Sequence, residues 1–286
     1  MDELDWTREL DEAVAGLARQ ALAEDHAAQD ITTSLCIPRG QMCRALLAAR
    51  HDAVLAGCRV AEIVLRCFGA DVQVVYRHSD GANVAAGQQC VEVQGDAAAL
   101  LSCERTILNI MQRLSGIATL TRRFVQAVEG CNVQIVDTRK TTPGWRILEK
   151  YAVRCGGGVN HRMHLADMIM VKDNHIALSG SSLQEIVQHA REMYPHMPIA
   201  CEADTLEQVR MLKELPVDLI MLDNMSPGEV RHATAMCGGS VCLEVTGGVT
   251  LANVREYAET GVNRISIGAL THSAPAVDIG MEIMPL

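Results

Sequence analysis

The segment from Asp137 to His175 concentrates cationic side chains in a chain whose formal net charge is −10. Its Arg, Lys and His residues are Arg139, Lys140, Arg146, Lys150, Arg154, His161, Arg162, His164, Lys172 and His175. Such clusters suit a small ligand with several negative charges, because Arg grips planar carboxylates and Lys acts as a point charge on phosphate. A solvated basic helix face is the alternative, but turn residues such as Thr-Thr-Pro-Gly and Gly-Gly-Gly interrupt the cations.

Two carboxylates further along the chain could do a different kind of chemistry. Glu202 and Asp223 each end a short apolar run. Such a pair can hold Mg²⁺ together with a diphosphate, bind ribose hydroxyls or stabilise a cationic sugar centre. A structural ion pair with Lys172 is the alternative for these acids.

Glycine turns are the third chemical feature. Gly247-Gly248 and Gly268 follow the last two apolar runs, and glycine lets backbone N–H groups approach a phosphate closely. A triple glycine shortly before His161 and Arg162 indicates a shaped loop over a ligand. The residues alone therefore predict an enzyme that holds a phosphorylated sugar on one side and a carboxylate-bearing partner on the other.

Repeated strand–helix units are the elements that must position these residues. In the second half of the chain, short apolar runs alternate with helices; the runs are 133–136, 168–171, 199–201, 219–222, 241–245 and 264–267. Capping boxes begin helices at Ser182, Thr205 and Ser226, and a further helix is expected from Thr250 to Gly261. Repeated βα units imply a parallel sheet, open or closed into a barrel, with the active site at the carboxyl ends of its strands.

The first part of the chain lacks this alternation. An amphipathic helix is predicted over 7–25 with Thr7 as its N-cap, followed by a turn at 30–33. A long helix over 97–128 is expected to be interrupted near Ser115-Gly116. Between them, strand and helix patterns mix over 42–57, 59–68, 72–74 and 90–93. This region is therefore predicted to be mixed α+β.

Composition restricts the class of protein. The 286 residues are 49% hydrophobic but only 3% aromatic, which predicts a large aliphatic core. The net negative charge argues against general binding to nucleic acid or to anionic membranes. The acidic start has no apolar stretch typical of a signal peptide, and no apolar run is long enough to span a bilayer. The 11 cysteines form no Cys-x-x-Cys pair, which favours buried free thiols in a reducing cytoplasm over disulfides or zinc.

Long motifs resemble those of one enzyme family over nearly the whole chain. The chain is similar to nicotinate-nucleotide pyrophosphorylase (carboxylating), also called quinolinate phosphoribosyltransferase, in the motifs DTRKTTPG, KYAVRCGGGVNHR, KDNHI, GALTHSAPAVDIG, ERTILNIMQRLSGIAT and DITT. It departs from the usual family residues at Gln29, Trp145, His164 and Thr246. None of these departures removes a charged ligand-binding residue.

The resemblance implies a reaction and its partners. The family joins quinolinate to phosphoribosyl pyrophosphate and releases CO₂ and pyrophosphate, yielding nicotinate mononucleotide on the route to NAD. The implied cofactor is Mg²⁺, and the implied assembly is a cytoplasmic homodimer with shared active sites, or a hexamer of three such dimers. Ionisation at the sugar would give an oxocarbenium-like centre. The ring nitrogen then bonds to the sugar, and the resulting pyridinium makes loss of the adjacent carboxylate feasible.

The resemblance also implies a fold and domain boundaries. An N-terminal α/β sandwich domain over 1–115 would cap an incomplete, seven-stranded α/β barrel over 116–274. The C-terminal tail, 275–286, would pack back on the first domain. Because the sequence shows only six apolar runs in the barrel region, the missing strand is expected near Gly157–Asn160.

The family's functional residues map onto this chain in two groups. The quinolinate carboxylates would be held by Arg139, His161, Arg162 and Lys172, with Arg105 reaching in from a neighbouring subunit. The phosphoribosyl group would be faced by Lys140, Glu202, Asp223, Thr246, Gly247, Gly248, Gly268 and His272. Further substrate-binding residues would be Thr138, Ile267 and Ala269. Catalysis would rest on Glu202, Asp223, Lys172 and Lys140, and Glu202 and Asp223 would also meet Mg²⁺.

Two other functions compete with this interpretation. A class I aldolase-like enzyme would use Lys172 as a Schiff-base nucleophile at a strand end, but the surrounding Arg residues and the lack of a clear base disfavour it. A non-catalytic metabolite-binding relative would keep the barrel without turnover, and the retained Glu202 and Asp223 argue against that.

Overall fold

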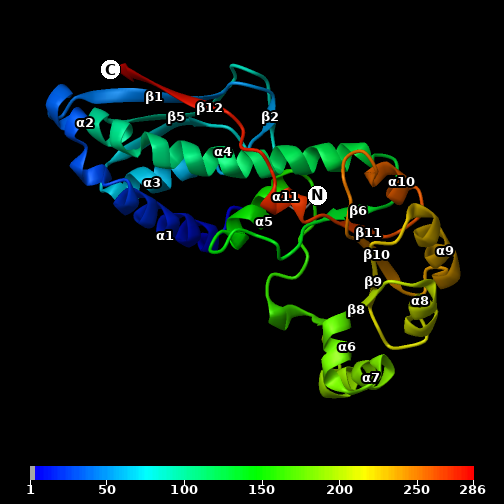
Figure 1. The fold of residues 1–286 in the computed structure, drawn as a ribbon. Coiled ribbons are helices and arrows are strands. Elements are labelled where there is room, and N and C mark those ends of the chain that lie inside the picture. The colour runs from blue at the N-terminus through cyan, green and yellow to red at the C-terminus, as the bar shows by residue number, and fades with distance from the viewer. Residues whose placement is uncertain (1–3) are drawn as a thin grey trace. The chain divides into compact units, whose positions relative to one another are not determined.

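The computed structural model describes residues 4–286 and divides into two compact units. The first unit comprises Met1–Arg122, Thr141–Gly157 and Leu270–Leu286, and the barrel unit comprises Arg123–Lys140 and Gly158–Ala269. The chain thus leaves the first unit within one helix, returns to it for residues 141–157 and ends in it (Figure 1). Within residues 4–286, every helix is too short or too polar to cross a membrane.

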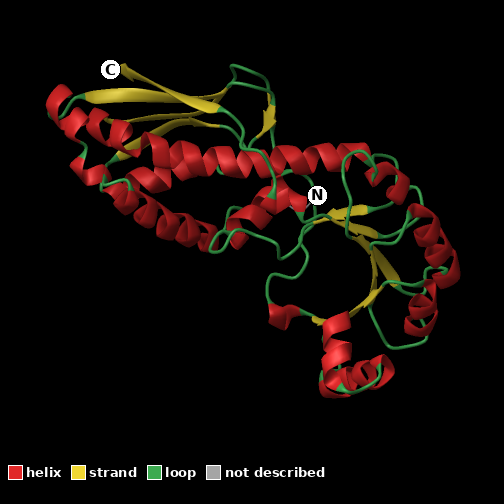
Figure 2. Cartoon of the chain, viewed as in Figure 1, coloured by secondary structure: helices red, strands yellow, loops and turns green. Residues whose placement is uncertain are grey.

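The first unit is built on an antiparallel sheet in the strand order β12-β1-β5-β3. Its strands are β1 (Met42–Ala49), β3 (Val72–Arg77), β5 (Gln89–Asp96) and β12 (Ile279–Pro285). A separate two-stranded ribbon pairs β2 (Ala53–Val54) with β4 (Asn83–Val84), so the expected strand material over 42–57 divides between two sheets. Every second residue of β1, from Cys43 to Ala49, is buried, which places one face of the sheet on the core (Figure 2).

Helices cover this sheet. The helical elements of the first unit are α1 (Arg8–Glu24), η1 (Ala27–Gln29), α2 (Ile31–Cys36), α3 (Val60–Phe68) and α5 (Arg146–Cys155), together with most of α4 (Ala97–Ala127) and of α11 (Ala269–His272). The α1 prediction is confirmed: the Thr7 hydroxyl accepts from Leu10 N–H, and Val14 and Ala18 lie on its buried face. The expected turn at 30–33 instead begins a helix, because the Asp30 carboxylate caps α2 through Thr33 N–H.

The expected interruption of the long helix was wrong. Helix α4 runs unbroken from Ala97 to Ala127 (Figure 1). The small residues within it serve close packing: Ser115 Oγ accepts from Ala56 N–H at 3.1 Å, and a side chain at Gly116 would overlap the carbonyl of Pro275. The C-terminal segment therefore crosses α4 at Gly116, where the helix has no side chain. This close approach explains why a glycine occurs in the middle of the helix.

The barrel unit contains a six-stranded, fully parallel sheet in the order β6-β11-β10-β9-β8-β7. Its strands match the six predicted runs and are β6 (Gln134–Val136), β7 (Ile169–Val171), β8 (Ile199–Ala203), β9 (Leu219–Asp223), β10 (Cys242–Thr246) and β11 (Arg264–Ser266). The expected seventh strand is a single parallel bridge between Val159 and Val136. This bridge extends the curled sheet beyond β6, and the α/β fold class is confirmed (Figure 2).

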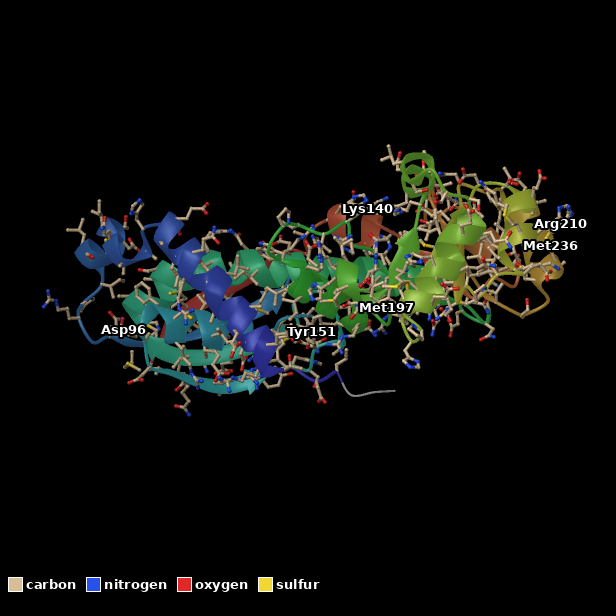
Figure 3. The ribbon with its side chains drawn as sticks, turned by 90° about the horizontal axis from the view of Figure 1, so that it is seen from below. Asp96, Lys140, Tyr151, Met197, Arg210 and Met236 are labelled. Atoms are coloured by element: carbon tan, nitrogen blue, oxygen red, sulfur yellow. The ribbon has the colours of Figure 1, made fainter. Side chains whose placement is uncertain are left out.

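Helices on the outer side separate these strands. They are η2 (Leu165–Asp167), α6 (Asp173–Ser179), α7 (Leu183–Met193), α8 (Leu206–Leu212), α9 (Pro227–Cys237) and α10 (Val254–Ala258). Ser182, Thr205 and Ser226 form the predicted capping boxes of α7, α8 and α9. Arg210 on α8 and Met236 on α9 mark two neighbouring helices in Figure 3. The helix expected to begin at Thr250 starts only at Val254.

The compact units are not the same segments as the predicted domains, 1–115 and 116–274, which stay predictions. The long helix carries the chain past residue 115, and the division falls after Arg122. Residues 141–157 belong to the first unit because α5 packs on α1 and Arg113 pairs with Glu149. All described cysteines are free thiols, but Cys36 is exposed, so the expectation that they are buried does not hold for all of them.

Candidate active site

The inner face of the curled sheet explains why the rim of the barrel unit is polar. A core cluster joins Ala200 and Met221 with Met170. Side chains alternate along a strand, so the residues two positions further point the same way. Those residues are Glu202, Asp223 and Lys172, which therefore meet at the carboxyl ends of their strands.

Lys172 and Glu202 form an ion pair between neighbouring strand ends. The side chain of Lys172 is 40% exposed and that of Glu202 is 15% exposed. The backbone of Lys172 is held as well, because its N–H donates to His175 Nδ1 at 3.0 Å. The pair is thus pre-positioned and still accessible to a ligand. Asp223 is half-buried at the end of the next strand.

Two arginines lie close together beside this pair. Arg162 donates from Nη1 to the Met168 carbonyl at 3.0 Å, which fixes its guanidinium. Partial burial, and then the nearby positive charge of Arg139, lower the pKa of Arg162. Within residues 4–286, no acceptor meets the buried Nε of Arg139. Adjacent, partly desolvated guanidinium groups provide a favourable site for an anion with more than one charge.

A fully buried acid organises the backbone beneath these arginines. Asp137 accepts His161 N–H at 2.8 Å and the side-chain amide of Asn160 at 2.6 Å. Next to it, the Thr138 hydroxyl accepts from Lys140 N–H at 3.0 Å, which makes a tight turn after β6. Asp137 therefore ties the loop of the DTRK motif to the loop that carries His161 and Arg162.

The ring of His161 is directed away from solvent. His161 is 9% exposed, and its Nδ1 accepts from Arg162 N–H at 2.7 Å. Its Nε2 lies 3.5 Å from Oε1 of Glu244, which is fully buried on β10. Burial raises the pKa of Glu244 to about 7. Sequence reasoning missed Glu244, although an acid inside the apolar run of β10, two positions before Thr246, was the available signal.

The glycine loop after β10 has the backbone expected of an anion-binding turn. Gly247 and Gly248 have φ angles of +87° and +62°, and Asn224 in the preceding strand's loop has +54°. Asn224 N–H donates to the Thr246 carbonyl at 2.9 Å, and a side chain at Gly247 would overlap Asn224. Only glycine therefore fits at position 247. A turn of this kind can direct its backbone N–H groups at an anion beyond the carboxyl end of β10. Ile267, which precedes Gly268 after β11, is buried and donates to Val136.

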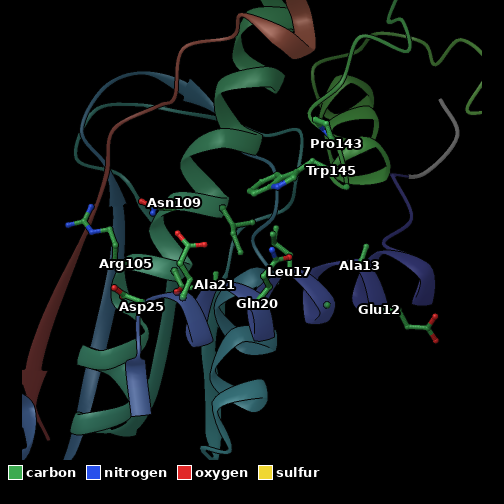
Figure 4. Close-up of a pocket in the computed structure, with 15 residues that line it drawn as sticks. Glu12, Ala13, Leu17, Gln20, Ala21, Asp25, Arg105, Asn109, Pro143 and Trp145 are labelled. Atoms are coloured by element: carbon green, nitrogen blue, oxygen red, sulfur yellow. The ribbon is translucent and has the colours of Figure 1, made fainter. Parts of the chain in front are cut away.

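Two predicted site residues lie in the first unit. Arg105 projects from α4 and lines a cavity of about 690 Å³, together with residues of α1 and the loop at Trp145 (Figure 4). His272 ends α11, is exposed, and has Nδ1 at 2.6 Å from Ser273 Oγ. Apart from these two, the predicted site residues all belong to the barrel unit. The departure Trp145 lines the same cavity as Arg105, whereas His164 lies at the start of η2.

The described residues contain no cluster of three or more His, Cys, Asp or Glu that could cage a metal ion. Glu202 and Asp223 nevertheless offer carboxylates on adjacent strands, on the same face of the sheet. Mg²⁺ is often held by one or two carboxylates plus substrate phosphates. The donor set therefore fits an ion that arrives with a phosphorylated substrate.

Comparison with known proteins covers both halves of the chain. Residues 30–115 match the family model "Quinolinate phosphoribosyl transferase, N-terminal domain", and residues 117–282 match the model of its C-terminal domain. The chain is 44% identical over 261 residues to a probable nicotinate-nucleotide pyrophosphorylase [carboxylating] of Bacillus subtilis, covering 91% of this chain and 90% of that protein. It is 43% identical to the Mycobacterium leprae nicotinate-nucleotide pyrophosphorylase [carboxylating], covering 95% and 98%.

Solved structures agree with this assignment. The nicotinate-nucleotide pyrophosphorylase from Francisella tularensis superposes with a TM-score of 0.91 at 33% identity, covering 99% of this chain and 100% of that one. NadC from Streptococcus pyogenes gives a TM-score of 0.91 at 35% identity, covering 99% of each chain. With both domains matched and close relatives aligned over nearly their full length, the chain belongs to the quinolinate phosphoribosyltransferase family.

Proposed function

We propose that this protein transfers the phosphoribosyl group of phosphoribosyl pyrophosphate to quinolinate with decarboxylation, giving nicotinate mononucleotide, CO₂ and pyrophosphate for NAD biosynthesis. Membership of the family supports this reaction. The observation that carries it within the structure is the cluster of Arg139 and Arg162 beside the Lys172–Glu202 pair. A ligand with two carboxylates matches those cations better than a ligand with one.

The cationic cluster would orient quinolinate. Arg139, Arg162 and Lys172 would hold its carboxylates, because each carries a positive charge next to the carboxyl rim of the sheet. Fixing an anionic ring against a second anionic substrate lowers the entropic part of the barrier, and this positioning contribution can be large. It would also bring the ring nitrogen to the sugar carbon.

The acids and the glycine loop would hold the sugar phosphate. Glu202 and Asp223 would lie beside the sugar ring as positive charge develops on it, and carboxylates stabilise an oxocarbenium-like centre. The Thr246–Gly248 turn offers backbone N–H groups to the 5′-phosphate, with Ile267, Gly268 and Ala269 following the next strand. Thr138 and Lys140 would complete the phosphoribosyl side from the loop after β6.

Mg²⁺ would be the cofactor, held by Glu202 and Asp223 together with the diphosphate. When bound, the ion would neutralise charge on the departing pyrophosphate. The protein's own part is to place the two carboxylates on neighbouring strands, with Lys172 next to Glu202. This role for the two acids follows from their chemistry and spacing.

The remaining site residues lead to a proposal about assembly. Arg105 and His272 belong to the first unit, whereas the other site residues belong to the barrel unit. We propose that a homodimer completes each site, with Arg105 of one subunit contributing to the quinolinate pocket of its partner and His272 serving the phosphoribosyl side. A hexamer of three dimers and a cytoplasmic location remain predictions.

The reaction is tested by following pyrophosphate release from purified protein. Quinolinate, phosphoribosyl pyrophosphate and Mg²⁺ should together give steady release, with one CO₂ and one nicotinate mononucleotide formed for each pyrophosphate. Omission of quinolinate is the control. Complete absence of turnover by folded protein would contradict the proposal and favour a non-catalytic binding role. Trapping of a substrate carbonyl on Lys172 by borohydride would instead favour the Schiff-base alternative.

Assembly is tested by complementation between Arg105→Ala and Lys172→Ala proteins, each inactive alone. When they are unfolded and refolded together, mixed dimers should regain part of the activity, because one of their two sites carries no substitution. Mixed dimers confirmed by mass but without recovered activity would show that Arg105 acts within its own chain.

A further inference from the structure

A buried carboxylate beneath the cationic cluster has no role in the proposed reaction. Glu244 lies in the middle of β10, is 0% exposed, and faces the interior of the curled sheet on the same side as Thr246. An acid in this position is costly, because burial without strong partners opposes the ionised form. No hydrogen bond within residues 4–286 meets either of its carboxylate oxygens, and its closest ion-pair partner is the ring of His161 at 3.5 Å.

The geometry around His161 defines which ring nitrogen carries the proton. Nδ1 accepts from the backbone N–H of Arg162 at 2.7 Å, so Nδ1 has no proton of its own. A neutral ring must then carry its proton on Nε2, and Nε2 faces Oε1 of Glu244. Both ring nitrogens are therefore directed at protein groups, and neither is aimed at the rim where a substrate carboxylate would lie.

The ring thus links the barrel interior to a substrate-binding arginine. The Glu244 carboxylate lies 3.5 Å from Nε2 of His161, and Nδ1 of the same ring accepts the backbone N–H of Arg162. Asp137 fixes the other side of the same loop by accepting His161 N–H. The guanidinium of Arg162 is then aimed by the carbonyl of Met168.

We propose that Glu244 is a positioning residue for quinolinate binding: its carboxylate, 3.5 Å from Nε2 of His161, attracts a proton on that nitrogen by charge, and His161 acts by fixing Arg162 rather than by contacting the substrate. The inference rests on the proposed function, because Arg162 matters only if a carboxylate binds there. It assigns a role to an acid that the reaction itself does not require. It also changes the expected role of His161 from ligand to support.

The charges that face Glu244 decide how this support responds to pH. The ring of His161 lies 3.5 Å from the Glu244 carboxylate. On the neighbouring strands, Arg264 of β11 and Met221 of β9 are paired with Glu244 in the sheet register. Asp137 and Ser266 also act on the Glu244 carboxyl group. Burial raises the pKa of Glu244 to about 7, the charge of Asp137 acts in the same direction, and Ser266 and Arg264 act against it. The negative charge beside His161 Nε2 is therefore lost as the pH falls through about 7.

Two substitutions separate positioning from packing. Glu244→Met keeps volume in an interior that already contains Met170 and Met221, but it removes the acceptor. Glu244→Gln keeps an acceptor oxygen without the charge. The KM for quinolinate should rise roughly tenfold with Met and only about threefold with Gln, while the KM for phosphoribosyl pyrophosphate and kcat change little. Val245→Ala, on the opposite face of the same strand, is the matched control and should lower Tm without changing either KM.

A double-mutant cycle tests whether Glu244 acts through His161. In a His161→Leu background, Glu244→Met should produce no further rise in the KM for quinolinate, because the group it orients is gone. The wild-type decline of kcat/KM for quinolinate below about pH 7 should be absent from Glu244→Gln. Effects that multiply independently in the double variant, or an unchanged KM in Glu244→Met, would overturn the proposal.

The deciding measurement is the tautomer of His161 in the full-length protein. Nitrogen NMR of protein labelled at its 10 histidines, with the His161 signal assigned by its loss in His161→Leu, should show a neutral ring protonated at Nε2 at pH 7.5. A ring protonated at Nδ1 or at both nitrogens would overturn the proposal. This readout does not depend on turnover, so failure of the proposed reaction would appear separately, as wild-type protein that releases no pyrophosphate.

Discussion

Two fully buried glutamates, one in each unit, differ in how their carboxylates are hydrogen-bonded. Glu149 in the first unit accepts from Arg113 at 2.8 Å and from both the backbone and the hydroxyl of Thr142, at 3.0 and 2.9 Å. Glu244 in the barrel unit accepts no hydrogen bond of comparable geometry within residues 4–286, and the ring of His161 lies 3.5 Å away. The first unit thus uses a buried charge with several hydrogen bonds to join segments of the chain, whereas the barrel unit keeps a buried charge without such hydrogen bonds beneath its cationic cluster.

The largest effect on stability is expected from Arg113→Ala. The substitution leaves Glu149 buried without its cation and also removes the hydrogen bonds from Arg113 to the carbonyls of Thr271 and Ala274. Breaking a buried pair in this way should lower the free energy of unfolding by about 3–5 kcal/mol. Urea unfolding measures it, and exposed Arg123→Ala on the same helix should stay within about 0.5 kcal/mol of wild type. Equal losses in the two variants would remove the distinction between the units.

Asp223→Ala should affect catalysis rather than stability. The carboxylate is half-buried at the rim, and its charge matters most as positive charge develops on the sugar. We expect kcat to fall by about 10²–10³-fold, with a much smaller change in the KM for quinolinate. Steady-state kinetics with Asp223→Asn as the isosteric control measures the effect. Weakened quinolinate binding with intact kcat would move Asp223 out of the sugar site.

Glu244→Gln should change how stability depends on pH. The pKa of Glu244 is raised in the folded protein from an ordinary value of 4.5 to about 7, so the neutral acid favours folding. That contribution is fully present below about pH 4.5 and is lost as the pH rises through about 7. Relative to wild type, Glu244→Gln should therefore gain stability between pH 4.5 and pH 7 and then level off. A difference in unfolding free energy that stays flat across this range would contradict the unmet charge at Glu244.

The smallest effect is expected from Tyr151→Phe in the first unit. The phenol donates to Asp80 at 2.6 Å, and the same carboxylate also accepts from Cys58 N–H at 2.9 Å. Because one partner remains, the loss should be only about 1–2 kcal/mol in the free energy of unfolding, with kcat unchanged. A loss as large as that of Arg113→Ala would show that the remaining hydrogen bond from Cys58 N–H does not compensate for the loss of the Tyr151 hydroxyl at Asp80.

The sequence predicted the barrel strands well, for a physical reason. Strands buried on both faces are continuous apolar runs, and capping boxes such as those at Ser182 and Ser226 mark the helices between them. Residues at the ends of those runs, such as Lys172 and Glu202, were found because strand ends meet at one edge of a parallel sheet.

Features that depend on tertiary contacts could not be predicted in this way. Gly116 was interpreted as a helix interruption, but only the crossing of Pro275 explains the glycine. Glu244 was missed because its neighbour His161 is 83 positions away in the sequence. Only the folded chain shows that the two side chains are close together. The proposed supporting role of His161 depends on the same contact. Local patterns define elements, whereas the partner of a buried charge is set by the fold.

The cluster of Arg139, Arg162 and Lys172 in the barrel unit is proposed to serve a substrate with two carboxylates. The most direct test compares kcat/KM for quinolinate and for nicotinate, which has one carboxylate fewer, in wild-type protein with saturating phosphoribosyl pyrophosphate and Mg²⁺. A site built for two carboxylates loses charge-assisted hydrogen bonds when one carboxylate is missing, so quinolinate should be preferred by about 10³-fold or more. Equal kcat/KM for the two acids would contradict the claim.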